Sequence, residues 1–149
     1  MSSVRHLLEF KGGNVWSVDA KASVYEALRL MNSKDVGALL VMEKDRMVGI
    51  VSERDCARRV ALLDKSPRQT LVSEIMTSKV YTVHPQQTVQ ECMVLMNKHH
   101  IRHLPVMAED GDKVIGVISI GDVLRDIIYQ QREKIKSYDG LPATRINVE

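Results

Sequence analysis

The stretch Gly49-Ile50-Val51-Ser52-Glu53-Arg54-Asp55 decides the fold, because its frame returns as Gly116-Val117-Ile118-Ser119-Ile120-Gly121-Asp122. Each copy has a glycine inside an apolar run, a serine three residues later and an aspartate three residues beyond the serine. The apolar run predicts a short buried strand, and the residues after the aspartate have helical periodicity. A strand that runs directly into a helix presents free backbone N–H groups, which suit a phosphate or a ribose. The sequence therefore predicts two copies of one candidate binding junction.

The duplication continues on both sides of these junctions. Leu95-Met96-Asn97 repeats Leu30-Met31-Asn32 at an offset of 65 residues, and two extra residues in the 108–113 turn raise the offset to 67. Each repeat predicts a strand, a helix, two strands and a second helix. In the first repeat these are residues 15–18, 23–32, 38–42, 47–51 and 55–63. In the second, strands at 80–83, 104–107 and 114–118 alternate in the same order with helices that start near residues 88 and 122.

The predicted fold class is mixed α/β, with two β-α-β-β-α units packed as a pseudo-two-fold pair of short mixed sheets flanked by helices. Each unit is too small for a core of its own, so we expect it to bury its sheet against its twin. The predicted division is an N-terminal segment (1–14), repeat 1 (15–66), a linker (67–77), repeat 2 (78–134) and a C-terminal tail (135–149). The N-terminal segment carries a short helix over 2–11, ended by Gly12-Gly13.

Composition excludes several classes of protein. The 149 residues are 44% hydrophobic and 27% charged, as in an ordinary globular domain, and the net charge of +2 gives no reason to expect nucleic acid. No apolar run is long enough for a membrane span, and the N-terminus has no signal-peptide pattern, so a cytoplasmic location is expected. Cys56 and Cys92 lie on apolar helix faces, which favours buried, reduced thiols.

The repeated unit, both Gly-x-x-Ser-x-x-Asp endings, Arg102-His103-Leu104-Pro105-Val106 and Ser73-Glu74-Ile75-Met76-Thr77 resemble a CBS-domain pair, the Bateman module, over about residues 10 to 130. This resemblance implies a non-catalytic regulatory module that binds an adenosine-containing ligand in clefts between the repeats. AMP, ATP and NAD(H) are the expected ligands, and S-adenosylmethionine is expected less than these. It also implies an unidentified protein partner and a homodimer, for which the apolar faces at 123–128 and 24–31 are the expected contacts.

The two aspartates are the central predicted binding residues. A carboxylate at a helix start, from Asp55 or Asp122, can accept hydrogen bonds from both ribose hydroxyls. The preceding serine, Ser52 or Ser119, offers a hydroxyl, and the glycine is expected to let a flat base approach the strand. Apolar neighbours would flank the adenine, namely Ile50 and Val117. The alternative is that each Ser-x-x-Asp is only a helix capping box.

The resemblance also implies that each cleft takes its aspartate from one repeat and its other contacts from the second. The Asp55 cleft is then lined by Thr77, Lys79, Tyr81, Arg102 and His103, and the Asp122 cleft by Asn14, Trp16, Gly37 and Ala38. Arg102 and His103 can donate charge-assisted hydrogen bonds to phosphate, so we expect the Asp55 cleft to carry more of the phosphate recognition. Arg54 is a further phosphate candidate, or else a solvated surface arginine. Trp16 either stacks on a ligand or fills space between the repeats.

The histidines do not predict a metal site. The pattern His99-His100-x-x-His103 has no nearby cysteine or aspartate to complete a tetrahedral set, so no metal is predicted.

Two alternative functions remain. An uncharacterised nucleotide-acting enzyme is one alternative, although no nucleophile or catalytic-triad spacing is visible. A structural or assembly module with degenerate clefts is the other.

Overall fold

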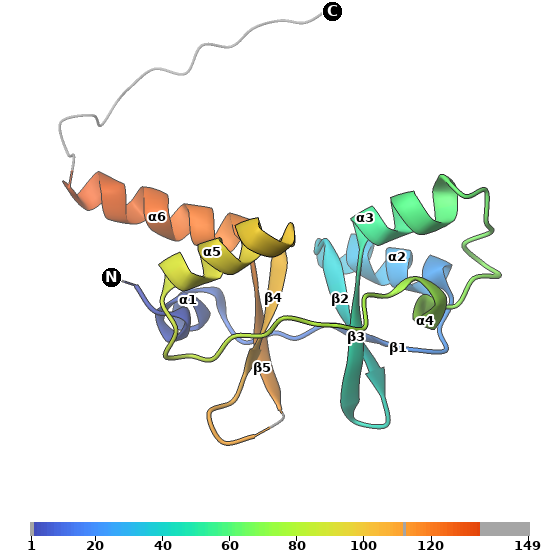
Figure 1. Cartoon of the computed structure of the whole chain (residues 1–149), viewed down its shortest axis with the longest axis horizontal. Helices are drawn as coiled ribbons and strands as arrows, with labels where there is room; N and C mark the ends of the chain where they lie inside the picture. Colours follow the sequence, from blue (N-terminus) through green and yellow to red (C-terminus); the bar gives the residue numbers. More distant parts are fainter. Residues whose placement is uncertain (1, 112, 135–149) are drawn as a thin grey trace, which may run out of the picture.

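The computed structural model describes residues 2–111 and 113–134, which form two similar halves side by side (Figure 1). The first half contains β1 (Ser17–Asp19), α2 (Val24–Lys34), β2 (Ala38–Glu43), β3 (Arg46–Ser52) and α3 (Glu53–Cys56), which continues as a π-helical stretch, Ala57–Ala61. The second half contains α5 (Val89–His99), β4 (His103–Met107), β5 (Val114–Ser119) and α6 (Ile120–Lys134). Two further helices, α1 (Val4–Lys11) and α4 (Val72–Ile75), precede the respective halves. The mixed α/β class is confirmed.

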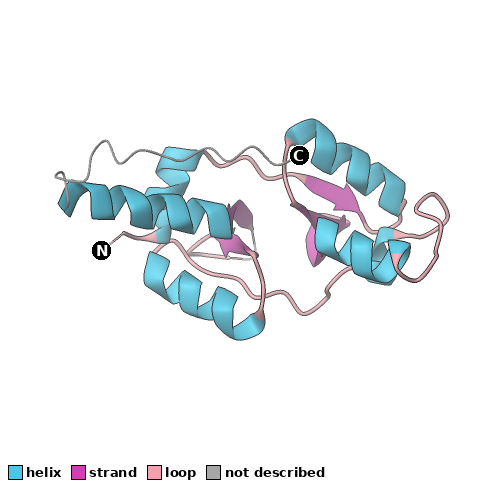
Figure 2. Cartoon of the chain, turned by 90° about the horizontal axis from the view of Figure 1, so that it is seen from above, coloured by secondary structure: helices cyan, strands magenta, loops and turns pink. Residues whose placement is uncertain are grey.

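Helices α2 and α5 begin where the sequence predicts, whereas α3 and α6 each begin two residues earlier than predicted, at Glu53 and Ile120. Ser23 and Glu26 form a complete capping box at the start of α2, and Thr88 and Glu91 form its counterpart at α5. Both helices end on a residue in the left-handed region, Asp35 at φ 53° and His100 at φ 54°. These short, well-defined helices lie on the outer sides of the strands when the molecule is seen from above (Figure 2).

The two sheets differ by one strand. In the first half β1 pairs parallel with β2, and β2 pairs antiparallel with β3, whereas the second half has only the antiparallel pair β4 and β5. The strand predicted at 80–83 is wrong: it is reduced to one bridge between Val83 and Val106. The cause is Pro105. In the first half the Leu40 N–H donates to the Trp16 carbonyl, 3.1 Å away, and the equivalent Pro105 has no N–H to donate.

The lead-in helices are exchanged between the halves. Helix α1 precedes the first half but docks on the second, where the N–H of Val4 donates to the Gln87 carbonyl at 2.8 Å. Helix α4 precedes the second half but docks on the first, where the N–H of Val72 donates to the Ala22 carbonyl at 2.8 Å. The described part of this segment, residues 2–14, therefore packs with the second half, a role that was not predicted from the sequence.

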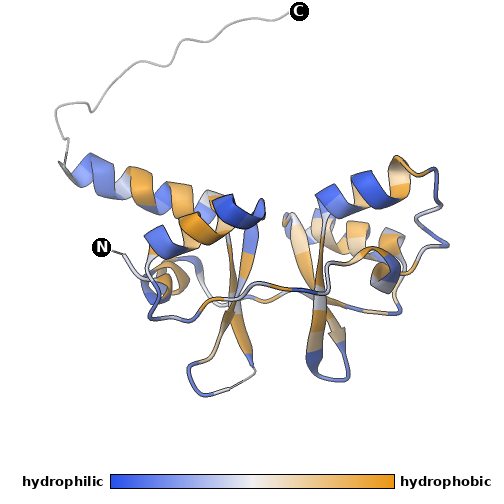
Figure 3. Cartoon of the chain, in the orientation of Figure 1, coloured by the Kyte–Doolittle hydropathy of each residue, from blue (hydrophilic) through white to orange (hydrophobic). Residues whose placement is uncertain are grey.

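The apolar core is divided between the halves. One cluster includes Val24, Leu39, Val51, Val72 and Ile75, and the other includes Val4, Leu7, Val89, Leu104 and Ile118. The expectation that each unit buries its sheet against its twin is wrong, because α1 and α4 supply the apolar surface that each unit lacks. Figure 3 shows hydrophobic residues along the strands of both halves. On the helices, hydrophobic and hydrophilic residues alternate.

The two cysteines are free and buried, as predicted. Burial raises the pKa of Cys56 to about 11, with smaller contributions from Asp55 and Glu53. Burial likewise raises the pKa of Cys92 to about 11. Both thiols are therefore protonated at neutral pH and poor nucleophiles. Within residues 2–111 and 113–134, no helix has the length and apolarity that crossing a membrane requires.

Candidate functional site

The two Ser-x-x-Asp junctions have nearly identical local geometry. At the first, the carboxylate Oδ2 of Asp55 accepts hydrogen bonds from the Ser52 N–H at 2.9 Å and from its hydroxyl at 3.0 Å. At the second, Asp122 Oδ2 accepts from the Ser119 N–H at 2.8 Å and from its hydroxyl at 3.0 Å. Each serine hydroxyl also accepts from the backbone N–H of its aspartate. The capping-box role of these residues is therefore real, and it fixes one oxygen of each carboxylate.

The surroundings of Asp122 are closed. The ammonium group of Lys11 lies 2.6 Å from Asp122 Oδ2, and the Arg125 guanidinium lies 2.5 Å from Oδ1. Lys11 also donates to the carbonyl of Val117 at 2.6 Å. The carboxylate is only 6% exposed. Its burial alone would raise the pKa of Asp122, but the hydrogen bonds from Lys11 and Ser119 outweigh burial and lower it.

The surroundings of Asp55 are open. Among the described residues Asp55 has no salt bridge, and the hydrogen bonds found to its carboxylate end on Oδ2. The residue equivalent to Arg125 is Arg58, at the offset of 67, and it is exposed. The equivalent of Lys11 is Lys79, at an offset of 68. Its ammonium group lies 5.8 Å from the ring centre of Tyr81.

The glycines of the two strands face the lead-in segments. A Cβ on Gly49 would lie 2.6 Å from the sulfur of Met76 and 2.9 Å from the carbonyl of Thr77. A Cβ on Gly116 would lie 2.5 Å from Leu8, the residue equivalent to Met76. The prediction that these glycines leave room for a base is therefore wrong, because the protein's own lead-in segments occupy that space.

The predicted neighbours Ile50 and Thr77 do lie together. Each donates its backbone N–H to the carbonyl of the other, at 3.0 Å and 2.9 Å. The lead-in to the second half thus pairs with the last strand of the first half. On the other side, the Cβ position of Gly13 lies 3.3 Å from the carbonyl of Ile115 in β5. At both junctions, therefore, the segment that precedes one half contacts the last strand of the other half.

His103 lies between the two predicted clefts. It pairs with Ser119 in its own sheet, and its imidazole lies 3.6 Å from the Cβ position of Gly37. The structure therefore joins two residues that the sequence analysis assigned to different clefts. Burial lowers the pKa of His103, the charges of Lys11 and Arg102 lower it further, and Asp122 opposes them. These surroundings thus favour the neutral form of the imidazole.

The other predicted residues are spread over both halves. Tyr81 stacks on His99 with ring centres 3.7 Å apart, and Trp16 carries the Lys34 ammonium 4.4 Å from its ring centre. Trp16 also packs against the first core cluster, in line with the space-filling interpretation. Ala38 pairs with Ser52 in the first sheet. The remaining three are exposed, namely Asn14, Arg54 and Arg102.

Comparison with known proteins identifies the two halves. The family model for the CBS domain matches residues 11–62 and 72–129, which cover most of the chain. The chain belongs to the CBS-domain family. The two matched segments coincide with the two sheets and their flanking helices, so the protein is a CBS-domain pair.

Several CBS-domain proteins resemble this pair along most of its length. The mitochondrial CBS domain-containing protein CBSX3 of Arabidopsis thaliana is 39% identical over 119 residues, 76% of this chain and 57% of that protein. The chain therefore spans a little over half the length of this relative. A proposed signal-transduction protein with CBS domains from Burkholderia ambifaria is 46% identical, with a TM-score of 0.83 over 87% of this chain and 96% of that one.

A more distant structure shares the fold. The CBS-domain pair of protein MJ0100, solved in complex with 5′-methylthioadenosine and S-adenosylmethionine, is 24% identical. Its TM-score is 0.76 over 87% of this chain and 98% of that one. At this identity the likeness concerns the fold of the CBS-domain pair.

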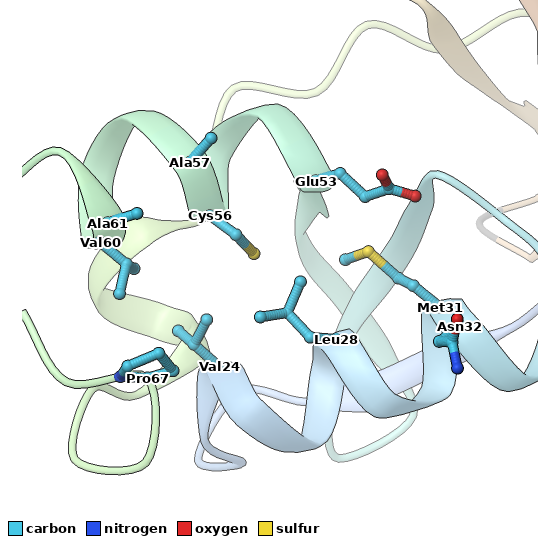
Figure 4. Close-up of a pocket in the computed structure, with 10 residues that line it drawn as sticks. All are labelled: Val24, Leu28, Met31, Asn32, Glu53, Cys56, Ala57, Val60, Ala61 and Pro67. Atoms are coloured by element: carbon cyan, nitrogen blue, oxygen red, sulfur yellow. The ribbon is translucent and has the colours of Figure 1, made fainter.

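One pocket of this CBS-domain pair lies away from the predicted clefts, between α2 and α3 (Figure 4). Its volume is about 440 Å³, and most of its lining is apolar, with Leu28 and Met31 from α2 and Val60 from the π-helical stretch that continues α3. The sequence analysis did not single it out, because the periodicity of both helices indicated only a core face. Within the described part of the chain, no three His, Cys, Asp or Glu side chains gather as a metal site would require.

Proposed function

We propose that this CBS-domain pair is a non-catalytic regulatory module that binds an adenosine nucleotide, AMP, ATP or NAD(H), at Asp55. The observation that carries the proposal is the state of the Asp55 carboxylate. Ser52 fixes its Oδ2, whereas its Oδ1 has no salt bridge among the described residues. An oriented carboxylate with a free oxygen suits the two hydroxyls of a ribose.

Three basic side chains are the proposed partners of the phosphates of such a ligand. Lys79 follows Thr77, which pairs with Ile50 on the strand that leads to Asp55. Arg54 is adjacent to Asp55 and exposed, and Arg102 is exposed at the start of β4. Each of these cations is free of a salt bridge within the described residues, so each can turn to a phosphate without breaking an existing ion pair.

The fold gives independent support for an adenosine ligand. The MJ0100 pair, which shares the fold, is a complex with two adenosine-containing compounds. At 24% identity the likeness concerns the fold, so the choice of ligand rests on the chemistry at Asp55. S-adenosylmethionine carries a positive charge and no phosphate, and the surrounding basic residues favour AMP, ATP or NAD(H) over it.

Ligand binding would act through the contact between the halves. The paired backbones of Ile50 and Thr77 join the last strand of one repeat to the lead-in of the other. A nucleotide that touches both segments would favour one arrangement of the repeats, and a protein partner would read that arrangement. Buried reduced thiols suit a reducing compartment, so we place this regulation in the cytoplasm.

We also propose a homodimer formed through helix surfaces. Leu124, Ile128 and Tyr129 on α6 are exposed by 47%, 54% and 58%. The second surface named in the sequence analysis fits less well, because Val24, Ala27 and Met31 are buried within the first half. Light scattering at micromolar concentration should give twice the chain mass, and an Ile128→Glu variant should reduce it. A monomeric wild-type protein would contradict this part of the proposal.

A thermal-shift screen tests the function. AMP, ATP, NAD, NADH and S-adenosylmethionine are each added to the wild-type protein, to Asp55→Ala and to Asp122→Ala. A ligand at 100 times its dissociation constant adds roughly 2.7 kcal/mol of stability, which corresponds to several degrees. We expect a shift with a phosphorylated ligand that is lost in Asp55→Ala. No shift with any of them would favour a structural module, and turnover of a nucleotide would indicate an enzyme.

A further inference from the structure

We propose that Lys11 is a built-in occupant of the Asp122 cleft, so that this cleft admits only ligands with anionic phosphates. This inference rests on the proposed nucleotide binding. It assigns to Lys11 a role in ligand selection, which the pattern of repeats alone does not indicate. Lys11 lies in helix α1, which precedes the first repeat in the chain but packs against the second, and from there it reaches the Asp122 junction.

The contacts of Lys11 cover the groups that a nucleoside would need. Its ammonium group donates to Asp122 Oδ2 and to the carbonyl of Val117, each at 2.6 Å. Arg125 takes the other carboxylate oxygen at 2.5 Å. Both oxygens of the predicted ribose acceptor, and the backbone of the residue predicted to flank the adenine, are therefore already engaged.

The difference between the repeats has a structural cause. Helix α1 has eight residues and holds Lys11 in its last turn, immediately before Gly12, whose φ of 94° ends the helix. Helix α4 has four residues and ends at Ile75, so the equivalent Lys79 lies beyond it in an irregular segment. The buried side chains of Val4 and Leu7 anchor α1 and thereby position its last turn over Asp122.

A ligand can bind to the Asp122 carboxylate only on the condition that it displaces Lys11. Neutral ribose hydroxyls would replace a charge-assisted hydrogen bond with weaker ones and leave the ammonium without its anion. A ligand with phosphates returns an anion to Lys11 and to Arg125 when they leave the carboxylate. The Asp122 cleft should therefore discriminate by ligand charge, with ATP ahead of AMP and AMP far ahead of adenosine, whereas the Asp55 cleft has no such condition.

Calorimetric titration in an Asp55→Ala background isolates the Asp122 cleft. With Lys11 present, we expect ATP to bind and adenosine to give no measurable heat. Lys11→Met keeps the length of the side chain but removes its charge and its hydrogen bonds. It should raise the affinity for adenosine at least tenfold and reduce the preference for ATP. The matched variant Lys79→Met, in an Asp122→Ala background, should bring no gain in adenosine affinity to the Asp55 cleft.

The outcomes separate this inference from the proposed function. Tight adenosine binding with Lys11 present, or no change on Lys11→Met, would overturn the role of Lys11 while nucleotide binding at Asp55 stands. Absence of binding to the wild-type protein and every variant would overturn both. If Lys11→Met does not fold, amine labelling of the wild-type protein decides: Lys11 should react more slowly than Lys79, and equal rates would overturn the inference.

Discussion

The Asp55 and Asp122 clefts share one backbone design and differ in which cations reach the carboxylate. Ser52 and Ser119 hold their aspartates in the same way, to within 0.1 Å in each hydrogen bond. Lys11 and Arg125 neutralise Asp122, whereas their equivalents, Lys79 and Arg58, form no salt bridge within residues 2–111 and 113–134. The two copies thus share the same junction. They differ because α1 is longer than α4, so that Lys11 at the end of α1 occupies the Asp122 cleft.

The largest difference expected between the two clefts is the loss of stability when the aspartate of each is removed. Asp122→Ala removes two ion pairs as well as the capping contacts, and we expect it to lower the free energy of unfolding by about 2 kcal/mol. Asp55→Ala loses only its capping contacts and should cost about 1 kcal/mol. Urea denaturation of both variants measures the difference. Equal losses would show that Lys11 and Arg125 do not stabilise the Asp122 junction.

The glycines in the two strands offer a second comparison. In Gly49→Ala the new Cβ would meet the carbonyl of Thr77 at 2.9 Å, and a backbone atom cannot move aside. In Gly116→Ala it would meet a terminal methyl group of Leu8, which can rotate. We expect a loss of about 2 kcal/mol for Gly49→Ala and about 1 kcal/mol for Gly116→Ala. Thermal unfolding distinguishes them, and a larger loss for Gly116→Ala would contradict the packing described.

Arg102 tests whether phosphate recognition belongs to the open cleft. Arg102→Ala should weaken AMP binding by about 1 kcal/mol, roughly fivefold, because the arginine is exposed, and should leave adenosine binding almost unchanged. Calorimetry with both ligands gives the two ratios. An equal loss for AMP and adenosine would remove Arg102 from the phosphate site.

The pH dependence of stability should report His103, at the boundary between the clefts. Burial lowers the pKa of His103 from its ordinary 6.5, so the unfolded chain takes up a proton first as the pH falls. Stability is therefore lost below pH 6.5, by less than about 1.4 kcal/mol per pH unit, the limit for one proton. Urea denaturation at pH 7.5 and 5.5 measures the loss, which should shrink in His103→Gln. An unchanged loss in that variant would assign it to other groups.

Much of this fold could be predicted from the sequence, because the repeat is strong. The offsets located both Ser-x-x-Asp junctions, and the periodicity located α2, α5 and their capping boxes. The strand predicted at 80–83 was wrong, although Pro105 could have indicated this, because it replaces the residue whose N–H would have formed the ladder. Local patterns are thus reliable where backbone hydrogen bonds decide the structure.

The closure of the Asp122 cleft could not be predicted in the same way. It depends on Lys11, which lies 111 residues from Asp122 and outside the predicted repeat. The docking of α1 on the opposite half decides this contact, and no periodicity within α1 specifies its partner. One signal was available: Leu8 and Lys11 correspond to Met76 and Lys79, which could have marked α1 as the counterpart of α4.

Hydrogen–deuterium exchange with and without AMP tests the central claim most directly, because it maps both clefts in one wild-type sample. We predict slower exchange at residues 50–56 and 77–81, with residues 117–123 unchanged at AMP concentrations that saturate the open cleft. Protection centred on residues 117–123, or no protection in either segment, would contradict the account of an open Asp55 cleft beside a self-occupied Asp122 cleft.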